Sequence, residues 1–285
     1  MSSFLEKYKR QPKIYVDFPS KGLYYNGDIV QDQQYTEIPV FGMNTMDEIM
    51  LKTPDALFSG EATANIIKSC IPVIKDPWSL VGFDIDHLLV AIRLATYGDS
   101  MPITSTCSEC KTENSSEVSL NKLLENFTGL SYQEQVKLKD LTFVIKPLTY
   151  RQYTEFSKQQ YVLQKQLVQI GQSEEETDQK TRQRVFDDLS KLNLTMILRH
   201  IAGITNNEEQ ETDIKAIEDF IINNDADFFK QVSDAVQKVT STWKVPPFEI
   251  KCGGEDCDRT YKTELSMDYA SFFGTNSFHS RSLIS

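Results

Sequence analysis

The alternation of apolar and polar residues predicts strands at the beginning of the chain. Residues 13–18 alternate, with Ile14, Val16 and Phe18 on one face, and residues 19–22 (Pro-Ser-Lys-Gly) follow with turn chemistry. A second strand pattern runs over about 35–41, after an Asn26-Gly27 pair that is typical of tight turns. The first forty residues therefore predict a small β-sheet.

Helical patterns follow. Short helices are expected over residues 45–51 and 60–70. The clearest helix is expected over 84–97, where apolar side chains recur at helical spacing: Ile85, Leu88, Leu89 and Ile92. We expect Asp84 to cap the start of this helix and Gly98 to end it.

The central part predicts a mixture of hairpins and long helices. β-like segments flank a tight turn at residues 107–110, a short helix is expected over 120–127, and residues 133–138 and 141–146 are expected to pair. Residues 150–201 predict two antiparallel helices joined by a polar loop that contains the acidic run 173–178. Two interpretations of this helical arm stay open: it packs on its own domain, or it binds a partner.

The last part of the chain returns to strands. Helices are expected over about 214–222 and 225–239, and two strands over 248–252 and 260–264 flank a second cysteine-containing turn. A polar tail to Ser285 is expected to be loosely held.

These patterns predict an α+β fold with three regions. Residues 1–130 are expected to form an α+β domain, with a small β part, helices and the first cysteine turn. Residues 131–245 are expected to form a hairpin and a mostly helical insertion. Residues 246–285 would supply the second cysteine turn and the tail, so that zinc-ribbon-like hairpins are assembled from two distant segments.

Composition narrows the class of protein. The chain has 285 residues, of which 40% are hydrophobic and 25% charged, as in an ordinary globular protein. Lys and Arg number 30 against 41 Asp and Glu, and the net charge of −11 disfavours broad nucleic-acid binding. No run approaches the ~18 apolar residues that a membrane span requires, and no secretory signal is recognisable at the N-terminus. We therefore expect no membrane partner and a reducing compartment.

The chemistry of the chain is concentrated in its cysteines. Cys107 and Cys110 are separated by two residues, Cys252 and Cys257 by four, and each pair lies in a predicted hairpin turn. Four thiolates placed in this way are typical of a closed, structural Zn²⁺ site with no position left for a substrate. Thiols without a metal, or a redox pair, are the alternatives, although a redox pair sits at a helix N-terminus rather than in a hairpin. Cys70 fits a core position.

No enzyme template fits the chain. It lacks the common nucleotide-binding, zinc-protease and serine-hydrolase motifs, and its three histidines, His87, His200 and His279, occur in unrelated contexts. We expect a protein without catalytic residues. Acidic pairs such as Asp84 and Asp86 are expected to serve as caps or solvated surface.

An ordered series of short sequence motifs resembles those of a known family. The motifs are residues 19–25 (PSKGLYY), 45–48, 51–57 (LKTPDAL), 60–62, 67–70 and 92–98 (IRLATYG). They resemble the baseplate hub and hub-assembly proteins of contractile-tailed bacteriophages of the T-even type. The resemblance spans roughly residues 16–110, and the C-terminal cysteine pair followed by residues 268–274 is similar to the family's ending.

The resemblance implies a non-enzymatic protein of the phage tail. It would be a hub subunit of the virion, or an assembly factor acting in the infected host cytoplasm. Its partners would be other baseplate hub proteins, with the tape-measure protein as a further candidate. Candidate partner-binding residues are Tyr24, Tyr25, Phe272 and Phe273, for which core packing is the alternative.

A zinc-ribbon nucleic-acid-binding protein is the alternative function. Such a protein needs a basic face. Around the predicted ribbon, basic residues such as Lys111 and Arg259 are balanced by acidic ones such as Glu109 and Asp258, so this alternative is disfavoured.

Overall fold

The computed structural model divides into two compact units. Met1–Leu130 and Lys244–Ser285 form the first unit, and Ser131–Trp243 form the second. The structure describes residues 4–25, 27–53, 58–128, 134–170, 176–206, 208–245, 247–254, 257–264, 272–273 and 278–282. Several residues singled out in the sequence lie outside this description: Asn26, residues 54–57, 133, 173–175, 255–256 and 268–271, and Gly274.

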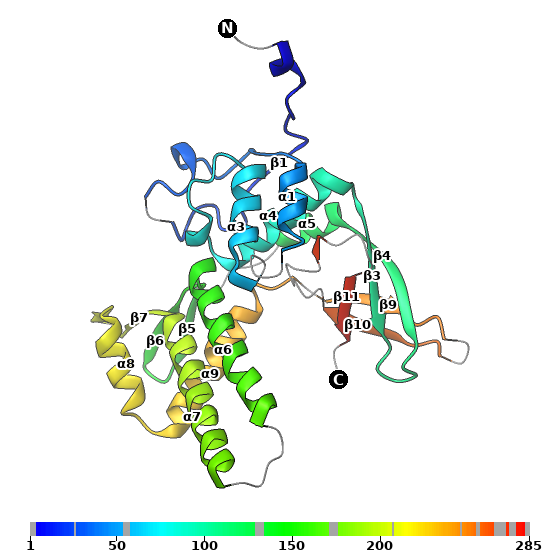
Figure 1. Ribbon diagram of the computed structural model, residues 1–285. Coiled ribbons are helices and arrows are strands. Elements are labelled where there is room, and N and C mark those ends of the chain that lie inside the picture. The colour runs from blue at the N-terminus through cyan, green and yellow to red at the C-terminus, as the bar shows by residue number, and fades with distance from the viewer. Residues whose placement is uncertain are drawn as a thin grey trace. The chain divides into compact units, whose positions relative to one another are not determined.

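The first unit begins with strands and short helices. Its N-terminal elements are η1 (Phe4–Tyr8), β1 (Ile14–Val16), η2 (Gln31–Gln33), β2 (Ile38–Val40), α1 (Thr45–Met50), α3 (Glu61–Cys70), η3 (Pro77–Ser79), α4 (Gly82–Tyr97), β3 (Ser100–Thr106), β4 (Glu113–Ser119) and α5 (Leu120–Thr128) (Figure 1). Strands β1 and β2 pair antiparallel, which confirms the small sheet. Asn44 caps α1 by accepting hydrogen bonds from the main-chain N–H groups of Met46 and Asp47.

Helix α4 is the core of this unit. Its residues Leu88, Leu89, Val90, Ala91 and Ile92 are consecutive and all fully buried. A helix that is buried on every side must be covered all round rather than along one stripe. The helix was expected to carry a single apolar face, so its central position is a finding of the structure.

The expected helix cap at Asp84 is wrong. The helix begins at Gly82 after the N-cap residue Val81, and Asp84 lies inside its first turn, fully buried. Its carboxylate accepts hydrogen bonds from the main-chain N–H of Ser20 (3.0 Å), the Ser20 hydroxyl and the Tyr25 hydroxyl (2.5 Å). The carboxylate therefore anchors the loop of residues 18–25 to the helix instead of capping it.

The glycine of that loop has a steric role. Gly22 adopts φ +82°, and a Cβ at this position would lie 2.4 Å from the ring of Tyr35. Any side chain would meet both a left-handed backbone and an aromatic ring. The close packing of the loop thus requires glycine there.

A five-stranded sheet completes the first unit. Its strand order is β4-β3-β11-β10-β9, with β9 (Phe248–Lys251), β10 (Thr260–Glu264) and β11 (Phe278–Ser282) supplied by the C-terminal segment. Hairpins β3-β4 and β9-β10 are antiparallel, whereas β11 runs parallel to β3 and antiparallel to β10. Strand β11 lies in the tail that was expected to be loose, and it joins the two cysteine hairpins into one sheet.

Among its described residues, the second unit combines a sheet with four helices. Its elements are β5 (Gln135–Leu138), β6 (Leu141–Ile145), α6 (Tyr150–Ile170), α7 (Glu176–Arg199), β7 (Ile201–Thr205), β8 (Gln210–Glu211), α8 (Ile214–Ile222) and α9 (Ala226–Ser241). The strands pair antiparallel in the order β5-β6-β7-β8. Helices α6 and α7 run side by side as the expected helical hairpin (Figure 1). Strands β7 and β8 were not predicted.

The α+β class is confirmed by these helices and small sheets. Across the part of the chain that the structure describes, no helix combines the length and the apolar character needed to cross a bilayer.

Candidate metal centre

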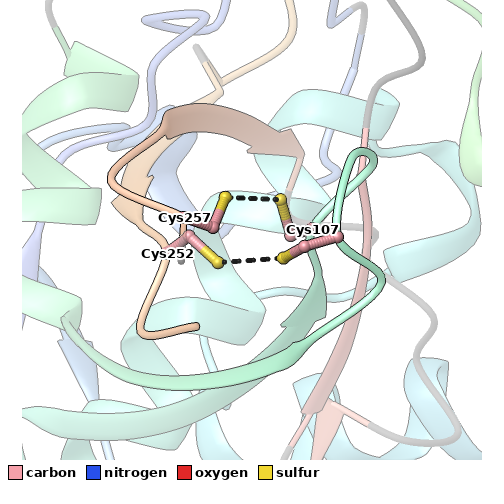
Figure 2. A group of neighbouring side chains, drawn as sticks. Cys107, Cys252 and Cys257 are labelled. Carbon is pink, nitrogen blue, oxygen red and sulfur yellow. Dashed lines mark hydrogen bonds between the residues drawn. The ribbon is translucent and has the colours of Figure 1, made fainter. Parts of the chain in front are cut away.

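The four cysteines of the two predicted turns come together in the first unit. The Sγ atoms of Cys107 and Cys257 lie 4.0 Å apart, and those of Cys110 and Cys252 lie 3.5 Å apart. All four Sγ atoms lie within 4.8 Å of one another. Figure 2 shows the sulfur atoms of the two hairpins pointing toward one another. Segments 142 residues apart thus share one cluster that could bind a metal ion.

The first turn is shaped by its own main chain. The N–H of Cys107 donates to the carbonyl oxygen of Thr112 (3.0 Å), and the N–H of Lys111 donates to the carbonyl oxygen of Cys107 (3.1 Å). Lys111 adopts φ 60°, a left-handed conformation that closes the turn. Both sulfurs can therefore point in the same direction from the turn between strands β3 and β4.

The second turn approaches the first very closely. The N–H of Cys252 donates to the carbonyl oxygen of Arg259 (2.8 Å), and the N–H of Cys257 donates to that of Gly254 (3.1 Å). A Cβ at Gly254 would lie 3.1 Å from the Thr112 hydroxyl and 3.5 Å from Cys110 Sγ. The glycine therefore lets the main chain of one turn pack against the side chains of the other.

Asn114 connects the two turns around the cluster. It is buried, and its Nδ2 donates to Cys252 Sγ (3.6 Å), to the Thr112 carbonyl oxygen (3.0 Å) and to the Tyr261 hydroxyl (3.1 Å). Its Oδ1 accepts from the N–H of Gly253 (2.7 Å). Outer groups of this kind orient the ligands of a metal site. Sequence reasoning did not find Asn114, because its only signal was its position at the start of a predicted strand.

The electrostatics of the cluster favour a bound cation. Hydrogen bonds from the side chain and main chain of Thr112 lower the pKa of Cys110 to about 6. Although the main-chain N–H of Arg259 lowers the pKa of Cys257, desolvation and the other cysteines raise it to about 12. Four adjacent sulfurs cannot all ionise without a compensating positive charge. Outside the cluster, Arg259 and Glu109 form an exposed ion pair (2.5 Å) between the two turns.

Cys70, His87 and His200 lie outside the cluster. Cys70 is buried in α3, and burial raises the pKa of its thiol to about 12. His87 is buried in α4, where burial lowers its pKa to about 4, and His200 Nδ1 lies 2.9 Å from the Lys146 carbonyl oxygen. Among residues that the structure describes, the four cysteines are the only group of histidine, cysteine and acidic side chains placed to share a metal ion.

Of the four aromatic residues proposed for partner binding, three are buried in the first unit. Tyr25, Phe272 and Phe273 are buried, and the Tyr24 ring packs edge-on against Phe83 with centroids 5.9 Å apart. Within the chain these side chains contribute to the core. Partner binding by the four residues stays a prediction.

Comparison with known proteins finds a family match over most of the chain. A family model described as "T4 bacteriophage base plate protein" matches residues 42–274 of the chain. The match includes the quoted stretches from residue 45 onward but not residues 19–25, and it spans both cysteine pairs and the whole second unit. Neither the search of curated proteins nor that of solved structures found a match. Because the family model covers most of its length, the chain belongs to the T4 bacteriophage base plate protein family.

Proposed function

We propose that this protein is a hub subunit of the phage baseplate, or a factor that assembles the hub, and that it acts through protein contacts without catalysis. Membership of the base plate family supports a structural role in the phage tail and contacts with other baseplate proteins. The hub proteins, and the tape-measure protein beside them, are the proposed partners. The protein would act in the tail of the particle or in the host cytoplasm during assembly.

We further propose that the cysteine cluster holds one Zn²⁺ ion through Cys107, Cys110, Cys252 and Cys257. A tetrahedral zinc ion with Zn–S bonds of about 2.3 Å requires sulfur atoms about 3.8 Å apart. The Cys110–Cys252 and Cys107–Cys257 Sγ separations, 3.5 and 4.0 Å, lie on either side of that value. The convergence of the four sulfurs is the observation that carries this proposal.

The zinc would have a structural role. With all four positions filled by cysteine, no position is left for water or substrate. The ion would instead link hairpins β3-β4 and β9-β10, whose cysteines are 142 residues apart. Because a preformed site rarely exists in the unfolded chain, most of the free energy of metal binding would stabilise the folded first unit.

Elemental analysis of protein purified under reducing conditions tests the zinc site. We expect about one zinc per chain. Cys252→Ser should lose the metal and unfold the first unit, whereas Cys70→Ala should keep the metal, because Cys70 lies outside the cluster. No zinc in the unmodified protein, or equal metal content in both variants, would contradict the proposal.

The hub role requires a test in the phage itself. A phage that cannot make this chain should assemble no complete baseplate, and tails of normal appearance in electron micrographs would contradict the role. Mass spectrometry of purified virions and of isolated baseplate intermediates then distinguishes a hub subunit from an assembly factor. A hub subunit is present in both samples, whereas an assembly factor is present only in the intermediates.

A further inference from the structure

A pocket in the second unit is not used by anything described so far. It lies beside β7, β8 and α8 and has a volume of about 670 Å³. We call it the acidic pocket, and its lining residues are Leu141, Ile204, Thr205, Asn206, Glu209, Gln210, Glu211, Ala216, Ile217 and Phe220. Its volume is in the range of sites that take a large side chain or a small ligand.

Apolar side chains form part of the wall of the acidic pocket: Leu141, Ile204, Ala216, Ile217 and Phe220. Phe220 lines the pocket with 40% of its surface exposed, and its ring packs edge-on against the buried Phe228 with centroids 5.6 Å apart. Ile214 and Ile222, at the two ends of the same helix, are 44% and 49% exposed. Of these three exposed apolar side chains, only Phe220 lines the pocket, where a partner could cover it.

The rim of the pocket is strongly negative. Residues 205–225 contain seven acidic residues and one basic residue, Lys215. Glu209 and Glu211 line the pocket, and Glu208, Asp213 and Asp219 are exposed nearby. Within the described ranges, none of these five carboxylates forms an ion pair with a basic side chain. Among the residues that the structure describes, these carboxylates are therefore available to pair with cations of a partner.

We propose that the acidic pocket binds a basic segment of another baseplate protein, in which a large apolar side chain is flanked by Lys or Arg. The apolar side chain fills the space beside Phe220 and Ile217. The flanking cations face Glu209 and Glu211, which steer the segment and fix its position. This inference rests on the proposed function, since it names the chemistry of a partner that a baseplate protein must have.

A short synthetic amphipathic peptide of leucine and lysine tests the pocket on the full chain. Binding is followed by fluorescence anisotropy, and the same peptide with glutamate in place of lysine serves as the reference. We expect only the lysine peptide to bind, with an affinity that falls as salt is added. Failure of the lysine peptide to bind, or equal binding of both peptides, would overturn the proposal.

Matched variants locate the binding site. Glu209→Lys with Glu211→Gln should weaken binding about tenfold, or about 1.4 kcal/mol; glutamine keeps the acceptor that Glu211 offers to the N–H of Asp213. Glu125→Lys with Glu249→Gln makes the same change in net charge at exposed positions of the first unit and should leave binding unchanged. Equal losses of peptide affinity in the two double variants would show general attraction to an acidic protein and would contradict the proposal.

The apolar part of the site and the proposed function are checked separately. Phe220→Ala should weaken binding while circular dichroism stays unchanged, and unchanged binding in a folded variant contradicts the pocket. Zinc content should be the same in all these variants, because the cluster lies in the other unit. Loss of peptide binding with normal zinc content therefore bears on the pocket alone.

Discussion

Arg93, inside helix α4, donates a hydrogen bond from Nη1 to the main-chain carbonyl oxygen of Phe272, 179 residues further along the chain. The guanidinium also lies over the rings of Tyr97 and Phe272, 5.4 and 5.6 Å from their centroids. Burial lowers the pKa of Arg93, but an arginine keeps its charge at neutral pH. The core helix of the first unit is thus tied to the C-terminal segment by a buried cation.

Replacing this arginine should destabilise the first unit. Arg93→Met keeps much of the apolar stem but removes the donor, and we expect a loss on the order of 2 kcal/mol in the free energy of unfolding. Urea denaturation followed by circular dichroism measures it. Lys68→Met, on the exposed face of α3, likewise replaces a cationic side chain by methionine and should stay within about 0.5 kcal/mol of the unmodified protein. Equal effects at both positions would show that the contact with Phe272 adds nothing.

Asp84 predicts a pH dependence of stability with an unusual sign. Burial raises its pKa to about 6, although the hydrogen bonds from Ser20 and Tyr25 act in the opposite direction. Because the folded pKa lies above the unfolded value of about 3.9, the stabilising contribution is complete below pH 4 and is lost as the pH rises through about 6. A difference of about two units between the folded and unfolded pKa corresponds to a loss on the order of 3 kcal/mol in the free energy of unfolding. Asp84→Asn should remove this loss.

The measurement is the difference between unmodified protein and Asp84→Asn in the free energy of unfolding from pH 4 to pH 7. Asp99 provides a comparison of opposite sign, because hydrogen bonds from the main chain of Asn121 lower its pKa. The contribution of Asp99 is present above the unfolded pKa and is lost as the pH falls. Parallel pH profiles for Asp84→Asn and the unmodified protein would refute the role given to Asp84.

Asn114 should control the affinity of the metal site without being a ligand. Asn114→Ala removes the donor to Cys252 Sγ and the acceptor for the N–H of Gly253. Loss of such an outer contact weakens metal affinity about 10- to 100-fold, measurable by competition with a chromophoric chelator. Asn193→Ala, at an exposed position of α7, is the control and should retain the unmodified affinity. An unchanged affinity in Asn114→Ala would show that the turns hold the sulfurs unaided.

The two neighbouring glycines of the second turn should differ in their tolerance of a side chain. A Cβ at Gly254 meets the Thr112 hydroxyl at 3.1 Å, whereas the nearest atom to a Cβ at Gly253 is Asn114 Oδ1 at an ordinary 3.5 Å. Gly254→Ala should therefore lower the metal affinity more than Gly253→Ala. The same chelator competition decides the order, and the reverse order would mean that the packing between the turns does not restrict the site.

Local sequence patterns were sufficient to predict most helices and strands of this protein. The helices α3, α4, α8 and α9 and the two cysteine hairpins follow from apolar spacing, turn residues and cysteine spacing, all of which act between near neighbours in the chain. The Cys107–Cys110 and Cys252–Cys257 spacings also pointed to the four residues that converge, because two cysteines in one hairpin turn can place both sulfurs on the same side.

The tertiary structure decided what depends on contacts between distant residues. Strand β7 has five residues and β11 pairs through its main chain, so neither needs a long apolar pattern of its own. Asp84 changes from an expected cap to a buried anchor because Ser20, 64 residues away, supplies its donors. The same holds for Asn114 beside Cys252 and for Arg93 beneath Phe272. The energies of such groups are set by burial and by partners that only the folded chain brings into contact, whereas spacing along the sequence records only which face a residue occupies.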